Sequence, residues 1–540
     1  MSDHEEFDAV VVGSGFGGSI PAYHLARGGA RVLVLERGPR LTADEYDQSL
    51  RFGSSSTRIF DFTAGDGMSV LGGNCVGGGS VVYFAAMPRA PRFVFDRTGA
   101  AGQRLWPDEV DRDALDPWYD RVSAALPVRT HTWDEVSKPG GLWAAVCDHG
   151  GLTANPLPSA VDTSRCTSCN WMMSGCVEDA KRSLLTNYIP AAEASGAEVR
   201  PLHEVQTVER EPDGGYLVRY THVDPVDYRV TTGEGVVRAR VVVLAAGAGA
   251  TPVILQRSEP HLGTMPDAVG RYFSGNGERI NVAVMDEDAV RDLLPEGATA
   301  GDRPYGAFQV GRGPVVATWD RLDGTLPEHE RFAIEQLYFP PGLGTILAQA
   351  RTDDGLPGWF GLEKKALLDE WRNWLMLFAL VEDDNEGEFG PPPPTGNAVR
   401  LSQQLLGRGT LRYRPHDSTL AAWRAADETI RRLIEGPGFG TVDPWTNDLV
   451  GAYTVHPLGS CRVGTDPATS ALDHTHELRG HEGIFVTDGS AVPTALTVNP
   501  SLTIAALAER AVPFVVDRLR QRGASVTYRA DLPAQVPVTA

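Results

Sequence analysis

Residues 13–18 read Gly-Ser-Gly-Phe-Gly-Gly, a glycine spacing that can bind phosphate. Gly13 permits a tight turn, Gly15 lets the backbone approach an anion, and Gly18 lets a helix pack closely on the preceding strand. The first turn of that helix offers unpaired N–H groups and a partial positive charge. Glu36 is placed where a carboxylate can accept hydrogen bonds from an adenosine ribose. The motif predicts a site for the pyrophosphate of a dinucleotide, and alone it does not distinguish a flavin from a nicotinamide.

The elements that must position this motif are visible on either side of it. The segments at residues 7–12 and 31–36 predict two strands, joined by a helix that follows the glycine-rich turn. Because glycines also cluster in ordinary turns, this strand–turn–helix context is what makes the motif specific. Pro21 falls inside the expected helix, where we expect it to remove one backbone hydrogen bond and to bend the helix.

The C-terminal region holds a second group of candidates. His456 begins a His-Pro-Leu-Gly turn, and the pKa of histidine near working pH suits it to proton transfer. Asn499 and Pro500 precede an apolar segment and predict a helix with Asn499 as its N-cap and Pro500 as its first residue. The positive end of that helix could stabilise negative charge on the pyrimidine edge of a reduced flavin. A structural histidine and an ordinary helix cap are the alternatives.

Three of the six cysteines, Cys166, Cys169 and Cys176, lie close together in the sequence. Their spacing is part of that of a metal site, but no clear fourth ligand lies nearby. We expect a local structural role and no bound metal, with an iron–sulfur or zinc centre as the alternative. The other three cysteines are scattered and predict buried free thiols, not a disulfide scaffold.

Composition narrows the class of protein. The chain has 540 residues, 42% of them hydrophobic, and this length predicts two lobes. A net charge of −21 disfavours binding to nucleic acid or to an anionic membrane surface. Residues 1–6 lack the basic start and apolar run of a secretory signal, and the longest apolar stretch, 241–255, is too short to cross a bilayer. We expect a cytoplasmic protein with no integral membrane association.

The remaining segments give coarser expectations. Residues 198–244 alternate apolar and polar side chains and predict a small sheet. A helix is expected around residues 363–380, followed by an acidic run at 382–388. The prolines at 391–394 predict a stiff surface loop, and the chain after Gly523 predicts a loosely held strap.

Several motifs occur together in the order that one enzyme family has them. They are the fingerprint at residues 13–18, Val76-Gly77-Gly78-Gly79-Ser80, His456-Pro457-Leu458-Gly459, Val486-Thr487-Asp488-Gly489-Ser490 and Val498-Asn499-Pro500. With these motifs the chain resembles the glucose–methanol–choline (GMC) oxidoreductases, which bind FAD, and among them it most resembles the cholesterol oxidase branch. The resemblance implies an α/β fold with a Rossmann-like FAD-binding lobe and a substrate-binding lobe built from a mixed or antiparallel sheet and helices.

The lobes are expected to be discontinuous in sequence. We expect the FAD-binding domain to comprise residues 1–90, 181–275 and 451–522. The substrate-binding domain would comprise residues 91–180 and 276–450, followed by a C-terminal tail, 523–540.

The resemblance also implies which residues contact FAD. The fingerprint and Glu36 would hold the ADP half, and Val205 would contact adenine through its backbone. Asp488 would reach the ribityl and phosphate region. The implied contacts are Gly13, Gly15, Phe16, Gly17, Gly18, Glu36, Gly73, Gly77, Gly78, Gly79, Ser80, Val205, Ala246, Gly247, Asp488, Gly489, Asn499 and Pro500.

The chemistry implied by the resemblance is oxidation of an alcohol to a ketone or aldehyde. His456 would help the hydroxyl proton to leave, and Asn499 would orient the same oxygen while a hydride passes to the flavin. Glu335 matches a glutamate that shuttles a proton during double-bond isomerisation in cholesterol oxidases. A solvated or ion-paired glutamate on a strand is the alternative for Glu335.

The substrate expected is a sterol-like or other bulky secondary alcohol, with O2 or an unidentified acceptor reoxidising the flavin. Val455 and Tyr83 stand where cholesterol oxidases usually have Tyr and Asn, and both departures could reshape the pocket. Two alternatives are a flavin-dependent lyase on the same fold and an electron-transfer protein using the cysteine trio. A nicotinamide enzyme is disfavoured because the C-terminal motifs have no place in it.

Overall fold

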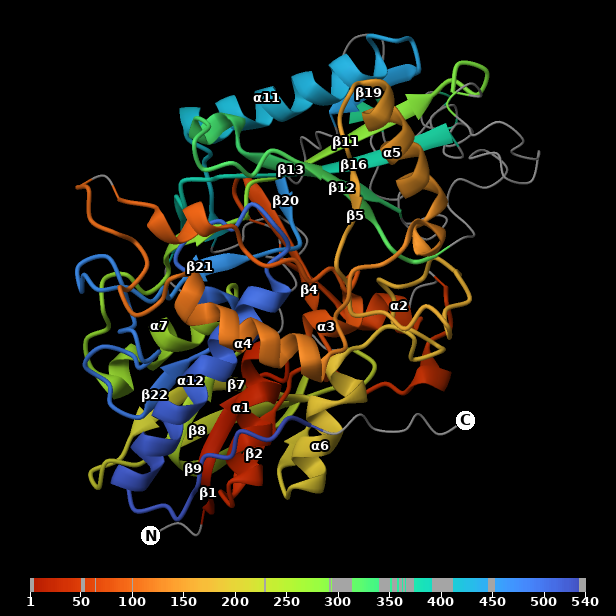
Figure 1. Ribbon diagram of the computed structural model, residues 1–540. Coiled ribbons are helices and arrows are strands. Elements are labelled where there is room, and N and C mark those ends of the chain that lie inside the picture. Colours follow the sequence, from red (N-terminus) through yellow and green to blue (C-terminus); the bar gives the residue numbers. More distant parts are fainter. Residues whose placement is uncertain are drawn as a thin grey trace.

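The structure is a computed structural model with two lobes, the lower and upper halves of Figure 1. It describes residues 4–49, 54–63, 65–99, 101–227, 230–290, 313–338, 373–390, 411–444 and 452–533, with a few isolated positions between 293 and 365. A seven-stranded sheet forms the centre of the lower lobe, and a six-stranded sheet lies in the upper lobe. The α/β fold expected from the sequence is confirmed.

The seven-stranded sheet carries the glycine motif. Its strands are β1 (Glu5–Val12), β2 (Val32–Leu35), β6 (Glu198–Arg200), β7 (His203–Arg210), β8 (Tyr216–Val223), β9 (Thr231–Leu244) and β22 (Ile484–Val486). They are ordered β6-β2-β1-β9-β8-β7, with β22 also paired to β9. The pairs among β6, β2, β1, β9 and β22 are parallel, and β7, β8 and β9 form an antiparallel extension. The loops that follow β1, β2, β9 and β22 therefore meet at one edge, where doubly wound sheets bind ligands.

Helices cover both faces of this sheet. The helices in the described part of the chain are α1 (Phe16–Arg27), α2 (Ser55–Arg58), α3 (Gly79–Val82), α4 (Arg112–Ala125), α5 (Lys138–His149), α6 (Tyr188–Ala194), α7 (Thr251–Leu262), α11 (Asp417–Ile434) and α12 (Ser501–Gln521). On one face α1 packs against α6 and α12, and α4 packs on α12, while α7 lies against β7 on the other face. None of the helices found among the described residues is long and apolar enough to cross a membrane.

Pro21 lies inside α1 without ending it. Proline lacks the N–H that would bond to the carbonyl four residues earlier, here that of Gly17. The Thr487 hydroxyl donates to this carbonyl at 2.7 Å instead. The lost backbone hydrogen bond is thus replaced from the end of β22, and the helix runs on to Arg27.

The six-stranded sheet is antiparallel. Its strands are β5 (Asn155–Pro156), β11 (Glu278–Met285), β12 (Ala317–Asp320), β13 (Phe332–Leu337), β16 (Trp374–Val381) and β19 (Gly440–Pro444). They are ordered β19-β11-β16-β13-β12-β5. One face packs on α5 and α11, through side chains such as Leu375 and Leu377. The opposite face, with Met376, Phe378 and Leu380, packs with residues that line the central cavity.

Strand β16 corrects the helix expected around residues 363–380. Every residue from Trp374 to Val381 is buried, because both faces of this central strand are covered. A strand buried on both faces has a continuous apolar run without alternation, which periodicity does not separate from a helix. Apart from isolated positions, residues 363–372 lie outside the described residues, as do the prolines at 391–394.

Three smaller sheets contain the other described strands. Their strands are β3 (Phe60–Thr63), β4 (Met68–Gly73) and β20 (Ala452–Thr454) in one, β10 (Arg271–Ser274), β17 (Gly387–Phe389), β18 (Leu411–Arg412) and β21 (Leu458–Ser460) in another, and β14 (Ala350–Arg351) and β15 (Pro357–Gly358) in a third. Helix α4, from the segment expected in the substrate domain, packs on the FAD lobe. The domain limits stay a prediction.

The segment after Gly523 is held more firmly than the expected loose strap. The Thr527 N–H donates to the Gly28 carbonyl at 3.0 Å, and Arg121 donates to the Ala530 carbonyl at 2.9 Å. Val526 is buried against the helices of the lower lobe. Regular periodicity is absent here because the contacts are made by backbone groups and single side chains.

Candidate active site

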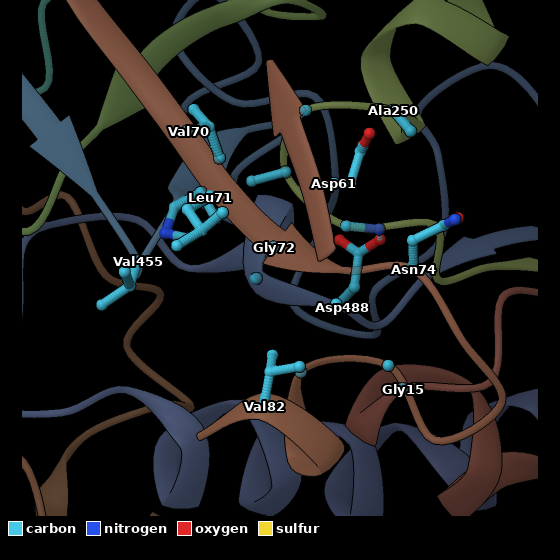
Figure 2. Close-up of a pocket in the computed structure, with 18 of the residues that line it drawn as sticks. Gly15, Asp61, Val70, Leu71, Gly72, Asn74, Val82, Ala250, Val455 and Asp488 are labelled. Carbon is cyan, nitrogen blue, oxygen red and sulfur yellow. Dashed lines mark hydrogen bonds between the residues drawn. The ribbon is translucent and has the colours of Figure 1, made fainter. Parts of the chain in front are cut away.

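A cavity of about 920 Å³ is lined by residues of both lobes. Figure 2 shows Val70, Leu71 and Gly72 on one side of it and Gly15 and Val82 on the other. The first lobe contributes the glycine turn after β1, the residues after β2, and the ends of β9 and β22. His456, Asn499 and Glu335 line the same cavity. The structure therefore brings the predicted cofactor and catalytic residues into one space.

Glu36 is built into the glycine turn. Its Oε2 accepts from the Ser14 N–H at 3.0 Å and from Ser14 Oγ at 2.7 Å, and its Oε1 accepts from the Gly38 N–H at 2.9 Å. Burial raises the pKa of Glu36, and these hydrogen bonds oppose the rise. Because a carboxylate has about four acceptor positions, Glu36 both fixes the turn and keeps acceptor capacity toward the cavity.

Asp488 fixes the other strand ends at this edge of the sheet. Its Oδ2 accepts from the Gly247 N–H at 2.7 Å and from the Thr251 hydroxyl at 2.6 Å. Its Oδ1 accepts from the Ser490 N–H at 2.8 Å. Burial raises the pKa of Asp488, which these bonds counteract. One carboxylate thus joins the turn after β9 to the turn after β22.

Asn499 contacts Glu335 directly. Asn499 Nδ2 donates to Glu335 Oε2 at 3.1 Å. Asn499 Oδ1 and Glu335 Oε1 are buried and have no hydrogen-bond partner in the described part of the chain. The contact corrects the expected N-cap: α12 begins at Ser501, Pro500 takes the cap position, and no side chain caps the helix. The Asn499 amide therefore lines the cavity and does not cap the helix.

The loop before Asn499 is strained and clamped. Thr497 has a φ of 56°, a left-handed conformation that is costly for a β-branched residue. On either side of it, Asn276 accepts from the Leu496 N–H at 2.7 Å and donates to the Val498 carbonyl at 2.9 Å. This clamp fixes the position from which Asn499 reaches Glu335.

His456 follows β20 and lines the cavity with 13% of its side chain exposed. Its ring packs edge-to-face on Phe378, with 5.7 Å between the ring centroids. Its backbone N–H donates to the Thr454 hydroxyl at 2.9 Å. Its Nδ1 lies 2.8 Å from Oε1 of Glu278, a residue that the sequence did not suggest. No motif marks Glu278, because the contact spans 178 residues.

Glu335 lies on the cavity face of β13, opposite Phe378 of β16. Burial raises the pKa of Glu335 to about 7, the charge of His456 and the Asn499 hydrogen bond oppose this rise, and Glu278 and Asp320 add to it. Near neutral pH this carboxyl group therefore exists in both protonation states.

Most of the predicted cofactor residues line the cavity. These are Gly13, Gly15, Phe16, Gly17, Glu36, Gly73, Gly78, Gly79, Val205, Ala246, Gly247, Asp488, Gly489, Asn499 and Pro500. The other three lie just behind its wall: Gly18 packs on Gly13, the Gly77 N–H donates to Ser14 Oγ, and Ser80 Oγ donates to the Gly77 carbonyl. Their roles as FAD contacts stay a prediction.

The glycines of the wall fit a bound dinucleotide. Among the described residues, and apart from the chain neighbours of each glycine, no protein atom lies within 4 Å of a Cβ built on Gly15, Gly72, Gly79 or Gly247, all of which line the cavity. The space beside these backbones is therefore open to a ligand. The same wall includes the N-terminus of α1, which favours an anion. Open space beside glycine backbone and a helix N-terminus are what the pyrophosphate of FAD would need.

Two glycines of the fingerprint should respond differently to alanine. A Cβ on Gly18 would lie 2.0 Å from the Gly13 carbonyl oxygen, whereas one on Gly15 meets only open cavity. We expect Gly18→Ala to lower the free energy of unfolding by about 1 to 3 kcal/mol and to lose FAD. We expect Gly15→Ala to fold normally and to retain less FAD. Thermal unfolding and the flavin-to-protein absorbance ratio measure the two effects, and normal flavin content in both variants would contradict this placement of the pyrophosphate.

The cysteine trio lies away from this cavity. Cys166, Cys169 and Cys176 are free thiols that line a separate space of about 20 Å³ beside Lys181. The Lys181 ammonium donates to the backbone carbonyls of Val81 and Met172, and burial lowers its pKa to about 8. In the described ranges no group of three or more His, Cys, Asp or Glu side chains is arranged to hold a metal ion. The structural role of the trio stays a prediction.

Comparison with known proteins places this geometry in a family. Two GMC oxidoreductase family models match residues 7–274 and 393–508. An uncharacterized GMC-type oxidoreductase of Mycobacterium tuberculosis is 29% identical over 93% of this chain and 74% of its own length. A cholesterol oxidase of the same organism is 26% identical over 94% of this chain and 90% of its own. A long-chain-alcohol oxidase of Arabidopsis thaliana is 25% identical over 95% of this chain and 68% of its own length.

A solved structure supports the fold. Pyridoxine 4-oxidase from Mesorbium loti superposes with a TM-score of 0.56 at 16% identity, covering 94% of this chain and 98% of that one. GMC oxidoreductases are FAD-binding flavoproteins whose members oxidise alcohols. With the matched models, the dinucleotide turn and the cavity in agreement, this chain belongs to the GMC oxidoreductase family and is an FAD-dependent oxidoreductase acting on CH–OH donors.

Proposed function

We propose that this enzyme oxidises a bulky, apolar secondary alcohol of the sterol type to a ketone. The observation that carries the proposal is the wall around the catalytic side chains. Its apolar members are Phe60, Phe84, Met173, Ile280, Val316, Leu337 and Phe378. Such a wall favours a large hydrocarbon body and leaves the few polar groups to bind a single hydroxyl.

The chain's own residues would divide the work at that hydroxyl. His456 would accept the hydroxyl proton, which leaves the carbon–hydrogen bond as the one still to be broken. The second Nδ2–H of Asn499 would donate to the same oxygen and orient it, because the first Nδ2–H is held by Glu335. Bound FAD supplies the hydride acceptor. The buried, apolar surroundings exclude water and strengthen these polar contacts.

The two departures from cholesterol oxidases lie in this wall. Val455 lines the cavity where a larger tyrosine is usual, and its side chain leaves additional room beside His456. The Tyr83 hydroxyl donates to the Arg182 carbonyl at 2.6 Å, so its ring and not its hydroxyl is offered to the cavity. The first change widens the pocket beside His456, and the second adds an aromatic ring to its wall. Both make the wall more apolar, which favours a substrate with a large hydrocarbon body. O2 or another compound would reoxidise the flavin.

Anaerobic titration of the purified holoenzyme tests the proposal. A 3β-hydroxysteroid, a long-chain primary alcohol and pyridoxine are each added while the visible flavin absorbance is followed. We expect bleaching by the steroid at the lowest concentration, weaker bleaching by the long-chain alcohol, and none by pyridoxine. Bleaching by pyridoxine alone would contradict the apolar assignment. Conversion of the steroid without bleaching would indicate a lyase instead of an oxidase.

A further inference from the structure

Glu278 is a buried carboxylate that the proposed reaction does not use. It begins β11, and its side chain is 1% exposed. Its Oε2 accepts from the Val455 N–H at 2.9 Å, and its Oε1 lies 2.8 Å from His456 Nδ1. Both ends of the carboxylate are therefore directed at the short segment that carries the catalytic histidine.

The charge of Glu278 points to a role beyond packing. An ionised carboxylate buried on an apolar sheet face is costly unless a positive group compensates it. Its neighbour Arg279 lies on the opposite face of the strand and binds Asp427 at 2.9 Å. Within the described residues, the ion pair of Glu278 is with His456. The histidine is thus the group whose positive form this carboxylate stabilises.

His456 Nδ1 and Glu278 Oε1 are close enough for a hydrogen bond but are not aligned for one. The Nδ1–Oε1 separation is that of a hydrogen bond, yet both atoms lack a well-aligned partner in the described part of the chain. Catalytic hydrogen bonds are often poorly aligned before substrate binds and tighten in the complex. Phe378 packs on the ring and restricts how far it can turn, which keeps Nδ1 beside Glu278.

We propose that Glu278 is a positioning residue that keeps a proton on Nδ1 of His456 and leaves Nε2 free to take the proton of the substrate hydroxyl. This inference rests on the proposed function of His456. In the step, the substrate O–H bond breaks and an Nε2–H bond forms, so the ring becomes an imidazolium. Glu278 keeps its negative charge and stabilises that cation without accepting a proton. The ring nitrogen bonded to a carboxylate sets which nitrogen of a histidine is protonated.

The Glu278→Gln variant removes the negative charge of Glu278 and keeps the size and shape of its side chain. The side-chain amide has one acceptor, whereas Glu278 faces two donors, the Val455 N–H and the histidine Nδ1–H. If the NH2 group faces His456, the proton moves to Nε2 and the base is lost. If it faces Val455, two donors oppose each other. Either arrangement removes the negative charge that stabilises the imidazolium.

The test is the pH profile of anaerobic flavin bleaching by the substrate. Among the described residues, the charged or titratable groups that face His456 are Glu278 from β11 and Glu335 from β13, with Asp320 acting on Glu335. We expect Glu278→Gln to slow bleaching about 10- to 100-fold and to move the acid limb of the profile to lower pH. Glu278→Asp keeps the charge and should restore the position of that limb better than it restores the rate.

The control variant is Glu509→Gln. Glu509 is also fully buried and also pairs with a histidine, His24, at 3.1 Å, but it does not line the cavity. We expect it to lower thermal stability and to leave the pH profile of bleaching in place. A purely structural role for Glu278 would produce the same pattern in Glu278→Gln and would overturn the proposal.

A second readout does not depend on activity. In 15N-histidine NMR spectra, the His456 resonance is identified by its loss in His456→Asn. We expect the Nδ1-protonated tautomer in the wild-type holoenzyme and a shift toward the Nε2-protonated form in Glu278→Gln. Unchanged tautomers would refute the role of Glu278 while leaving His456 as the base. Normal bleaching in His456→Asn would instead refute the proposed function itself.

Discussion

Replacing both His456 and Asn499, as His456→Asn with Asn499→Ala, should leave FAD bound and slow its reduction by substrate about 10³- to 10⁴-fold. A positioned general base contributes about 10²- to 10⁴-fold to rate, and removing the orienting amide adds misplacement of the same oxygen. The side chains removed lie at the substrate end of the proposed mechanism, whereas Glu36, Asp488 and the glycine turn remain intact. Flavin content should therefore stay near that of the wild-type protein.

The single variants measure the separate contributions of His456 and Asn499. If both residues act on one hydroxyl, as proposed, their effects should combine to less than the product of the two. His456→Asn alone should cost about 10²-fold or more and should remove the acid limb of the pH profile. Asn499→Ala should cost less, but it also removes the donor to Glu335 Oε2. We expect Asn499→Ala to shift the pH dependence of the remaining activity, because the hydrogen bond it removes lowers the pKa of Glu335.

Stopped-flow measurement of anaerobic flavin bleaching provides the rates. His329→Asn and Asn155→Ala, at exposed positions away from the cavity, are matched controls that should bleach at the wild-type rate. Loss of flavin in the double variant would mean that these residues hold the cofactor. An unimpaired bleaching rate with full flavin content would end the assignment of His456 and Asn499 as the catalytic pair.

The parts of the site that could be predicted from the sequence are those made by local segments. The turn after β1 needs glycines where an added Cβ would strike backbone, as at Gly13 and Gly18. These glycines can be read directly from the sequence, so the turn could be predicted from it. The His456 turn and the Asn499-Pro500 pair are also local, and both reach the cavity as expected.

The parts that could not be predicted depend on contacts between distant segments. Asn499 has the sequence of an N-cap, but a hydrogen bond to Glu335 on another strand takes its amide. Glu278 contacts His456 only because the fold brings β11 next to the segment after β20. Strand β16 has no alternation because tertiary packing covers both of its faces. In each case tertiary contacts outweigh the local preference.

Replacing Glu335 by glutamine should stabilise the enzyme above neutral pH. The pKa of Glu335 is raised by burial to about 7 from an ordinary value of 4.5. The folded protein therefore binds a proton that the unfolded chain has already released between these two values. Stability due to this group is fully present below pH 4.5 and is lost as pH rises through 7, by about 3 kcal/mol in all.

Glutamine imitates the protonated acid at every pH. Its carbonyl oxygen can still accept from Asn499 Nδ2, and it carries no charge to bury. Wild type and Glu335→Gln should unfold at similar temperatures at pH 4.5, whereas at pH 8.5 the variant should unfold about 2 to 3 °C higher, given the unfolding entropy of a chain this long. Differential scanning calorimetry of both holoenzymes, with excess FAD present, measures the difference.

The stability of Glu509→Gln relative to wild type should change with pH in the opposite direction to that of Glu335→Gln. Burial raises the pKa of Glu509, but the hydrogen bond and charge of His24, together with the Tyr188 hydrogen bond and the Arg121 charge, outweigh it, and the net pKa is lowered. Its contribution to stability is therefore present at neutral pH and is lost in acid. Glu509→Gln should be destabilised most at neutral pH, where Glu335→Gln begins to gain. If Glu335→Gln instead loses stability at pH 8.5, the ionised form is the one that the cavity favours, and Glu335 would be a charged partner of His456 rather than a proton carrier titrating near neutral pH.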